Sequence, residues 1–251
     1  MQLSVRWGLL SVALILFLAG YLVVRFDAPD LASVVSVIFL IGLALPSYIA
    51  LVRWLGAVRG IGLLVLLSLL PLLVEAYAVA TGVPYGRFTY SPHLGDPLFD
   101  LVPWTVAFAY LPMLLGAVTV ASAAVGTAWY RLIPAGTLLL LLIDLVIDPA
   151  AVHAGLWVWA EEGAYYGVPV SNFAGWVLTG AAYIGLISLI AARKLAAARS
   201  VPGMVASSLL LILAFWIGYL AQNGLLIPAF LGAGLFAATC LVVFRDDSPR
   251  E

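Results

Sequence analysis

Three carboxylic acids lie within or beside long apolar stretches of the sequence. Glu75 and Asp144 are surrounded by aliphatic residues, and Asp148 follows one helical turn after Asp144. A carboxyl group at the centre of a bilayer costs about 3 kcal/mol, which favours a functional role over a structural hydrogen bond between helices. Residues four apart share one helix face, so the two aspartates should lie side by side. Glu75, Asp144 and Asp148 are therefore the candidate catalytic residues.

The positions of these acids predict a common pocket. Pro149 should end the helix that carries both aspartates, because proline lacks the N–H that a helix interior needs. At about 1.5 Å of rise per residue, Glu75 and Asp144 then have similar depths and could face one another. Carboxyl groups that are buried near one another tend to hold a proton at neutral pH. One acid that donates a proton, a second that holds water, and aromatic faces that stabilise a cation would suit protonation of an alkene.

Aromatic residues are concentrated in two segments rich in Gly and Pro, at about 81–100 and 148–172. Rings of this kind also form the belts found at any membrane interface. Their density beside the acids favours a binding role for the set. The candidate substrate-binding residues are Tyr85, Arg87, Tyr90, Trp157, Trp159, Tyr165, Tyr166, Asn172 and Trp176.

The composition indicates which kind of structure must position these residues, namely helices that span a membrane. Of the 251 residues, 65% are hydrophobic and 9% are charged, with a mean hydropathy of +1.17, so too few polar side chains exist to cover a water-soluble fold. A membrane-spanning helix needs about 20 apolar residues. Eight such runs occur, at 7–24, 31–52, 61–80, 101–125, 132–147, 173–192, 203–220 and 225–244. We expect an all-α, polytopic protein of the cell membrane, with one transmembrane domain over residues 1–251.

The distribution of basic residues predicts the orientation. Eight spans place both termini on one side, and cytoplasmic loops carry an excess of Lys and Arg. Only Arg25 and Arg87 fall on the side opposite the N-terminus. The other nine Lys and Arg residues fall on the side of the termini: Arg6, Arg53, Arg59, Arg131, Arg193, Lys194, Arg199, Arg245 and Arg250. Both termini should therefore be cytoplasmic, and the two aromatic segments should lie outside.

Residue counts exclude several classes of membrane enzyme. Two histidines cannot supply the roughly eight ligands of a histidine-box di-iron oxygenase. The single lysine, Lys194, lies outside the apolar runs, which argues against a retinal Schiff base. A formal net charge of −1 offers no basic field for nucleic acid. One cysteine excludes a cysteine metal cluster, and we expect neither a metal nor an organic cofactor.

The motifs in the central part of the chain resemble those of the membrane-integral carotenoid hydratases. They are Thr-Gly-Val-Pro-Tyr-Gly-Arg-Phe-Thr-Tyr within 75–94, Asp-Leu-Val-Ile-Asp-Pro at 144–149, Trp-Val-Trp at 157–159, and the Gly-to-Trp run at 163–176. The resemblance implies a hydro-lyase that adds water to a terminal isopropylidene double bond of an acyclic carotenoid. Arginine outnumbers lysine ten to one, as suits a halophilic archaeon, so the expected conversion is bisanhydrobacterioruberin to bacterioruberin.

The expected partners are a lipophilic carotenoid, membrane lipid and, by association, other membrane enzymes of the same pathway. Three other functions stay open at this point. A membrane lycopene cyclase would use the same protonation and close a ring instead of admitting water. An intramembrane prenyltransferase would use Asp144 with Asp148, or Asp96 with Asp100, to hold Mg²⁺ and a diphosphate. A lipid or proton transporter would use the buried acids as a proton relay.

The first prediction concerns topology. A reporter fused after Glu251 should be cytoplasmic, and one inserted near Asp96 or Glu161 should be external, because the basic residues gather on the side of the termini. Labelling of each reporter in intact and in permeabilised cells measures this. The opposite labelling pattern would contradict eight spans with cytoplasmic ends.

Overall fold

The computed structural model describes residues 2–22 and 29–245, with the backbone alone described for 2–6, 29–33 and 93. It is 77% helical. The long helices are α1 (Gln2–Leu22), α2 (Pro29–Leu55), α3 (Ala57–Thr81), α4 (Val106–Val125), α5 (Trp129–His153), α6 (Val170–Ile190), α8 (Ser207–Gln222) and α9 (Leu226–Val243). The short elements include α7 (Ala192–Ala196) and the 3-10 turns η2 (Pro92–Leu94) and η3 (Gly203–Ala206).

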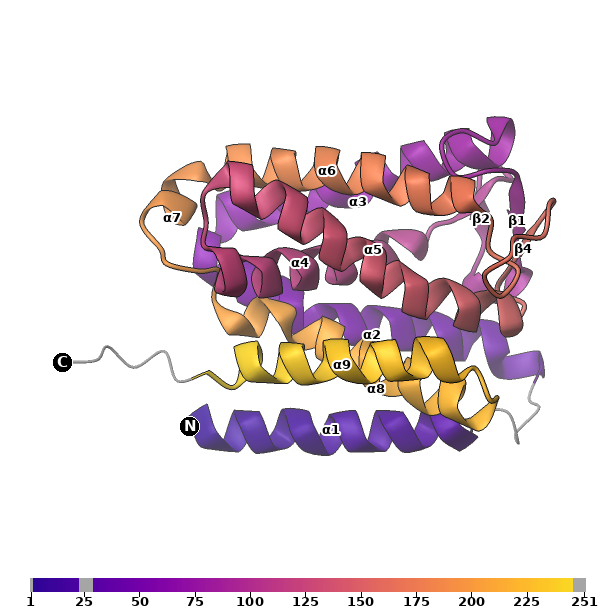
Figure 1. Ribbon diagram of the computed structural model, residues 1–251, viewed down its shortest axis with the longest axis horizontal. Helices are drawn as coiled ribbons and strands as arrows, with labels where there is room; N and C mark the ends of the chain where they lie inside the picture. The colour runs from indigo at the N-terminus through magenta and orange to yellow at the C-terminus, as the bar shows by residue number, and fades with distance from the viewer. Residues whose placement is uncertain (1, 23–28, 246–251) are drawn as a thin grey trace.

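The predicted all-α membrane fold is confirmed. Within the described ranges, seven helices are long and apolar enough to cross a bilayer, and α1 contributes the shorter apolar helix Trp7–Leu22. The start of α1 and the end of α9 lie at the same end of the bundle (Figure 1). Which side of the membrane that end faces stays a prediction. The end of the first predicted span at 23–24, with Arg25 and Arg250, lies outside the described residues.

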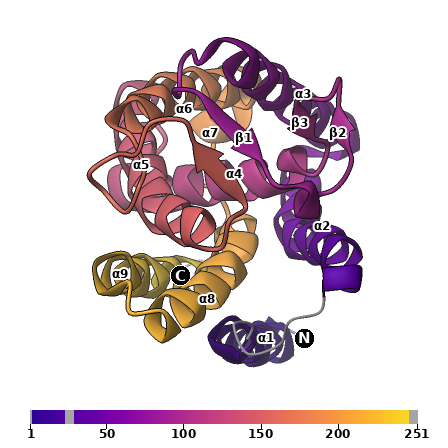
Figure 2. The ribbon, with the colours of Figure 1, turned by 90° about the vertical axis from the view of Figure 1, so that its right-hand side faces the viewer.

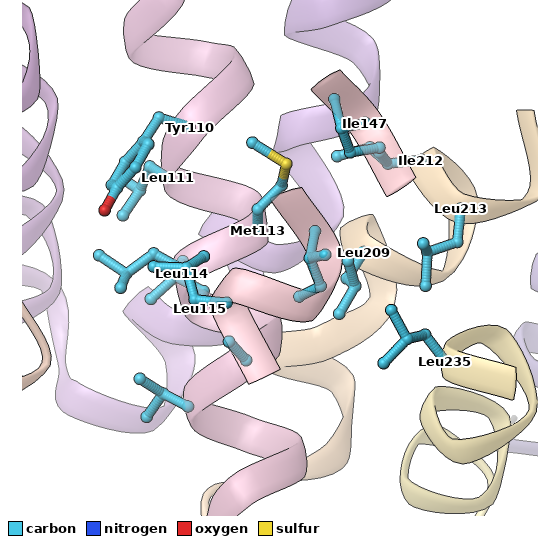
Figure 3. Packing of buried hydrophobic residues seen from close by; sticks show 14 of the residues in the cluster. Tyr110, Leu111, Met113, Leu114, Leu115, Ile147, Leu209, Ile212, Leu213 and Leu235 are labelled. Atoms are coloured by element: carbon cyan, nitrogen blue, oxygen red, sulfur yellow. The ribbon is translucent and has the colours of Figure 1, made fainter. Parts of the chain in front are cut away.

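Helix α4 occupies the centre of the bundle. It contacts α2, α3, α5, α6, α8 and α9, and it is buried along most of its length. In the view of Figure 3, Leu209 of α8 lies between Met113 and Leu114 of α4 on one side and Leu235 of α9 on the other. Since apolar side chains surround α4 on every side, the outer helices are held in place around it.

The two aromatic segments form one cap over an end of the bundle. Strand β1 (Phe88–Tyr90) pairs antiparallel with β4 (Trp157–Trp159), so Phe88 lies opposite Trp159 and Tyr90 opposite Trp157. The pair lies across the end of the helix ring (Figure 2). A second antiparallel pair joins β2 (Pro97–Leu98) to β3 (Val102–Pro103). Segments that we predicted as separate loops are therefore a single structural unit.

Helix α5 corrects one expectation. Pro149 does not end it, because the helix continues to His153. Proline leaves the carbonyl of Leu145 without its usual N–H donor, and the hydroxyl of Tyr165 donates to that oxygen at 3.0 Å. Asp148 is thus inside the helix rather than at its end, and the connection between α5 and α6 is 154–169 instead of beginning at 148.

Helix α4 corrects a second expectation. The fourth span was predicted from residue 101, yet helix begins at Val106. Residues 101–105 instead contain strand β3 and the turn after it. The hydroxyl of buried Thr105 donates to the carbonyl of Leu94. This contact ties the start of α4 to the first aromatic segment.

Helices α1 and α8 approach each other through two glycines. A Cβ on Gly20 of α1 would overlap the Phe215 carbonyl of α8, and a Cβ on Gly218 of α8 would overlap the Phe17 carbonyl of α1. Small residues allow two helix backbones to come this close in a membrane.

We expect Gly218→Ala to lower the stability of the protein by about 1–3 kcal/mol, because overpacking forces the two backbones apart. Thermal unfolding in detergent measures the effect. Gly234→Ala on α9 is the matched control, since open space surrounds that position. Equal shifts in Tm for the two variants would contradict the close approach.

Candidate functional site

A cavity of about 300 Å³ lies beneath the cap. Side chains of α2, α3, α4, α5, α6 and α8 and both strands β1 and β4 contribute to its wall. Most of these side chains are apolar or aromatic. Two carboxyl groups and one amide reach the wall, from α3, α5 and α6: Glu75, Asp148 and Asn172. The small hydroxyls of Ser36 and Thr105 also line it.

Glu75 accepts a hydrogen bond from a tyrosine of the cap. Its side chain is 8% exposed, and its Oε2 accepts a hydrogen bond of 3.0 Å from the hydroxyl of Tyr90 on β1. Burial, and next the charge of Glu75, raise the pKa of Tyr90 well above its ordinary value. The phenol therefore stays protonated and remains a donor to the carboxyl group.

The two aspartates share one amide. Nδ2 of Asn172 donates to Oδ2 of Asp144 at 3.1 Å and also to Oδ2 of Asp148. A side-chain amide carries two hydrogens, so it can serve both acceptors at once. All three side chains are buried. Oδ1 of Asp144 has no hydrogen-bond partner among the described residues.

Tyr85 links the two groups of acids. Its hydroxyl donates to Oγ1 of Thr179 at 3.2 Å. Burial raises its pKa above the ordinary value first, and the charges of Glu75 and, more weakly, Asp144 raise it further. Glu75 from α3 and Asp144 from α5 therefore act on the same phenol.

Aromatic pairs line the wall beside the acids. The strand register stacks Phe88 against Trp159, with ring centroids 4.9 Å apart. Tyr90 meets Trp157 edge to face at 6.1 Å. Such walls present π faces toward a bound group and can stabilise a positive charge.

The structure brings most of the predicted site residues to one cavity. The residues on its wall are Glu75, Tyr85, Tyr90, Asp148, Trp157, Trp159, Asn172 and Trp176. Asp144 is fully buried behind Asn172. It is therefore Asp148, rather than Asp144, that shares the wall with Glu75.

Three other predicted residues lie away from the cavity wall. Arg87 is exposed in the cap. Tyr165 contacts the Leu145 carbonyl, as described above, and packs edge to face on Phe173 at 5.9 Å. Tyr166 adjoins it with a positive φ of 52°. Tyr165 and Tyr166 therefore shape the second aromatic segment, and Arg87 lies on the surface of the first.

Sequence reasoning missed several residues of the cavity wall because they stand inside apolar runs. They are Phe39 on α2, Tyr110 and Met113 on α4, and Phe215, Trp216 and Tyr219 on α8. In the sequence, only a tyrosine in the middle of a span could have indicated such a residue, because its hydroxyl needs a polar partner. Tyr219, for example, meets Nδ1 of His153 at 2.9 Å.

Within the described residues, no three His, Cys, Asp or Glu side chains are arranged to hold a metal ion. The polar groups on the cavity wall include carboxyl, amide and phenol groups. Such groups can donate and accept protons and orient a water molecule.

The chain has recognisable relatives among known proteins. The chain matches the protein family described as "Carotenoid biosynthesis protein" over residues 31–239. It is also similar to bisanhydrobacterioruberin hydratase of Haloarcula japonica, at 38% identity over 122 residues. That match covers 47% of this chain and 41% of the relative's length, so the chain spans less than half of the relative. No solved structure matches the chain.

The shared amide generates the next prediction. Asn172→Leu should lower stability by about 1–3 kcal/mol, because it leaves buried carboxyl oxygens without a donor. Thermal unfolding measures it, with Val170→Ala as the control, since Val170 is exposed on the first turn of the same helix. A variant as stable as the control would show that Asn172 does not hold the two aspartates.

Proposed function

The chain belongs to the carotenoid biosynthesis protein family, and from this premise we propose that it is an enzyme that adds water to a terminal double bond of an acyclic carotenoid. One observation carries the proposal. An otherwise apolar, aromatic cavity has carboxyl groups from two different helices on its wall, Glu75 and Asp148.

The aspartate pair is the better proton donor of the two groups. Two adjacent carboxyl groups in an apolar site repel when both are charged, so the pair retains one proton. Asp148 presents this pair to the cavity. Glu75 accepts a hydrogen bond from Tyr90, so its carboxyl group already acts as an acceptor in the site. We therefore assign proton donation to Asp148, supported by Asp144, and proton acceptance to Glu75.

The reaction then needs no reactant other than the carotenoid and one water molecule. Asp148 gives its proton to carbon 2 of the terminal double bond, and the π electrons form the new C–H bond and leave a tertiary cation at carbon 1. The oxygen of water bonds to carbon 1, and the proton it releases goes to Glu75. Return of that proton to the aspartate pair restores the enzyme. Trp157, Trp159 and Trp176 shield the cation with their π faces.

The cavity holds the end of the substrate rather than the whole molecule. Its volume of about 300 Å³ is at the lower limit of ordinary small-ligand pockets, and a carotenoid is a long chain. The wall away from the acids comes from α2 and α8, where the rings of Phe39 and Phe215 pack with centroids 4.8 Å apart. We propose that the polyene leaves the cavity between these helices and continues into lipid.

The relative's name suggests the substrate. It is called a bisanhydrobacterioruberin hydratase, and we propose the same carotenoid for this chain, in the cell membrane where such a lipophilic substrate dissolves. Association with other enzymes of the pathway would pass on an insoluble product without transfer through water.

We expect Glu75→Gln and Asp148→Asn each to lower hydration at least about 100-fold, because each removes a proton-transfer group. The test expresses the protein in a host that makes the acyclic carotenoid and weighs the pigments, since hydration adds the mass of one water per end. Glu162→Gln is the control, because Glu162 is exposed in the cap.

The same experiment separates the alternatives. A product of unchanged mass and altered absorption would indicate ring closure and a cyclase. An active, stable Asp148→Asn would remove the proton donor from this mechanism, and an active Glu75→Gln would remove the acceptor. Unconverted pigment in the presence of the unaltered protein would contradict the proposed function itself.

A further inference from the structure

Two buried tyrosine hydroxyls lie beside the cavity without a partner. Tyr110 of α4 is 4% exposed and Tyr183 of α6 is 6% exposed. Neither hydroxyl has a partner with hydrogen-bond geometry among the described residues, and Thr179 is the side chain nearest to forming one with Tyr110. A buried hydroxyl without a partner costs about 1–3 kcal/mol. Two of them in adjacent positions therefore indicate a bound polar group.

The two hydroxyls belong to one cluster. The rings of Tyr110 and Tyr183 meet edge to face with centroids 5.6 Å apart. Tyr110 also packs against Trp176 at 5.1 Å and lines the cavity. In Figure 3 its oxygen points away from the hydrocarbon side chains of Ile147 and Ile212. The cluster thus lies next to the proposed place of the cation.

The neighbouring hydroxyls of Tyr85 and Thr179 have no proton left to donate to these two. Tyr85 donates to Thr179, and Thr179 donates in turn to the carbonyl of Gly175 at 2.9 Å. Both of those protons are committed. Tyr110 and Tyr183 each retain one donor and one acceptor. The group that fits must accept and donate hydrogen bonds and must be small, and water meets these requirements.

We propose that the hydroxyls of Tyr110 and Tyr183 bind the water molecule that adds to the carotenoid; this rests on the proposed hydratase function. Held there, the water donates a hydrogen bond to one phenol oxygen and accepts one from the other phenol, which leaves a lone pair free to bond to carbon 1 and one hydrogen free for Glu75. After the C–O bond forms, the released proton goes to Glu75 and both tyrosines are unchanged. The tyrosines position water and take no part in the first proton transfer.

If the two tyrosines position the water, removing either hydroxyl should make capture of the cation by water less frequent than loss of a proton from it. In D₂O, the aspartate pair carries deuterium and places it on carbon 2. A cation that is captured by water gives the alcohol. A cation that instead loses a proton gives back an alkene, which now carries the deuterium. The ratio of deuterated carotenoid to alcohol therefore measures capture by water separately from protonation.

We expect Tyr110→Phe and Tyr183→Phe each to raise this ratio on the order of tenfold, the effect of one lost hydrogen bond to the water. Purified protein in lipid vesicles that contain the carotenoid, analysed by mass spectrometry, gives both products. Tyr77→Phe is the matched control, because Tyr77 is exposed on α3. The Tm of the two cavity variants should not fall, because each lost hydroxyl had no protein partner.

The outcomes distinguish the two proposals. If the unaltered protein makes no alcohol, the proposed function fails whatever the tyrosines do. If it makes alcohol and the Phe variants keep its ratio of products, the water site is wrong and the hydratase stands. If the variants lose alcohol and deuterated alkene equally, or unfold, the tyrosines are structural and the water site is also overturned.

Discussion

The burial of three carboxyl groups in an apolar bundle is the constraint on which the rest of the structure depends. A carboxyl group removed from water is costly unless hydrogen bonds or a retained proton compensate for it. Tyr90 provides the bond for Glu75, and Asn172 provides bonds for both aspartates. Each donor lies on a different element from its acid, Tyr90 on β1 and Asn172 on α6. Stability of the acids therefore requires the tertiary arrangement to be complete.

The cap and helix α5 meet this requirement together. Tyr90 is held on β1 by pairing with β4, and β4 follows directly from the end of α5. Helix α5 extends past Pro149 because Tyr165 satisfies the freed Leu145 carbonyl. That extension keeps Asp148 in helical register with Asp144, so one amide can reach both. The aromatic segments thus hold the acids in position as well as cover the cavity.

The cavity has two chemically different sides. This division explains how one site could react with the end of a long hydrocarbon and bind the rest of it. The acids and the amide lie on α3, α5 and α6, while α2 and α8 contribute mostly hydrocarbon and aromatic surface. A terminal double bond can then meet proton donors while the polyene stays among apolar groups. The partnerless hydroxyls of Tyr110 and Tyr183 extend the polar side toward α4 and α6.

The sequence by itself determined the membrane helices and the candidate acids, because hydrophobicity is a local property and an acid in an apolar run is visible without a fold. It also placed Asp144 and Asp148 on one face, since the helix period is regular. Only the tertiary structure decided that Asp148 shares the cavity wall with Glu75 and that Tyr110 and Tyr183 stand together. It also decided that α5 passes Pro149. The physical reason is common to all three: the partners are separated in sequence, and a ring or carbonyl in an apolar run gives no sign of what it will contact.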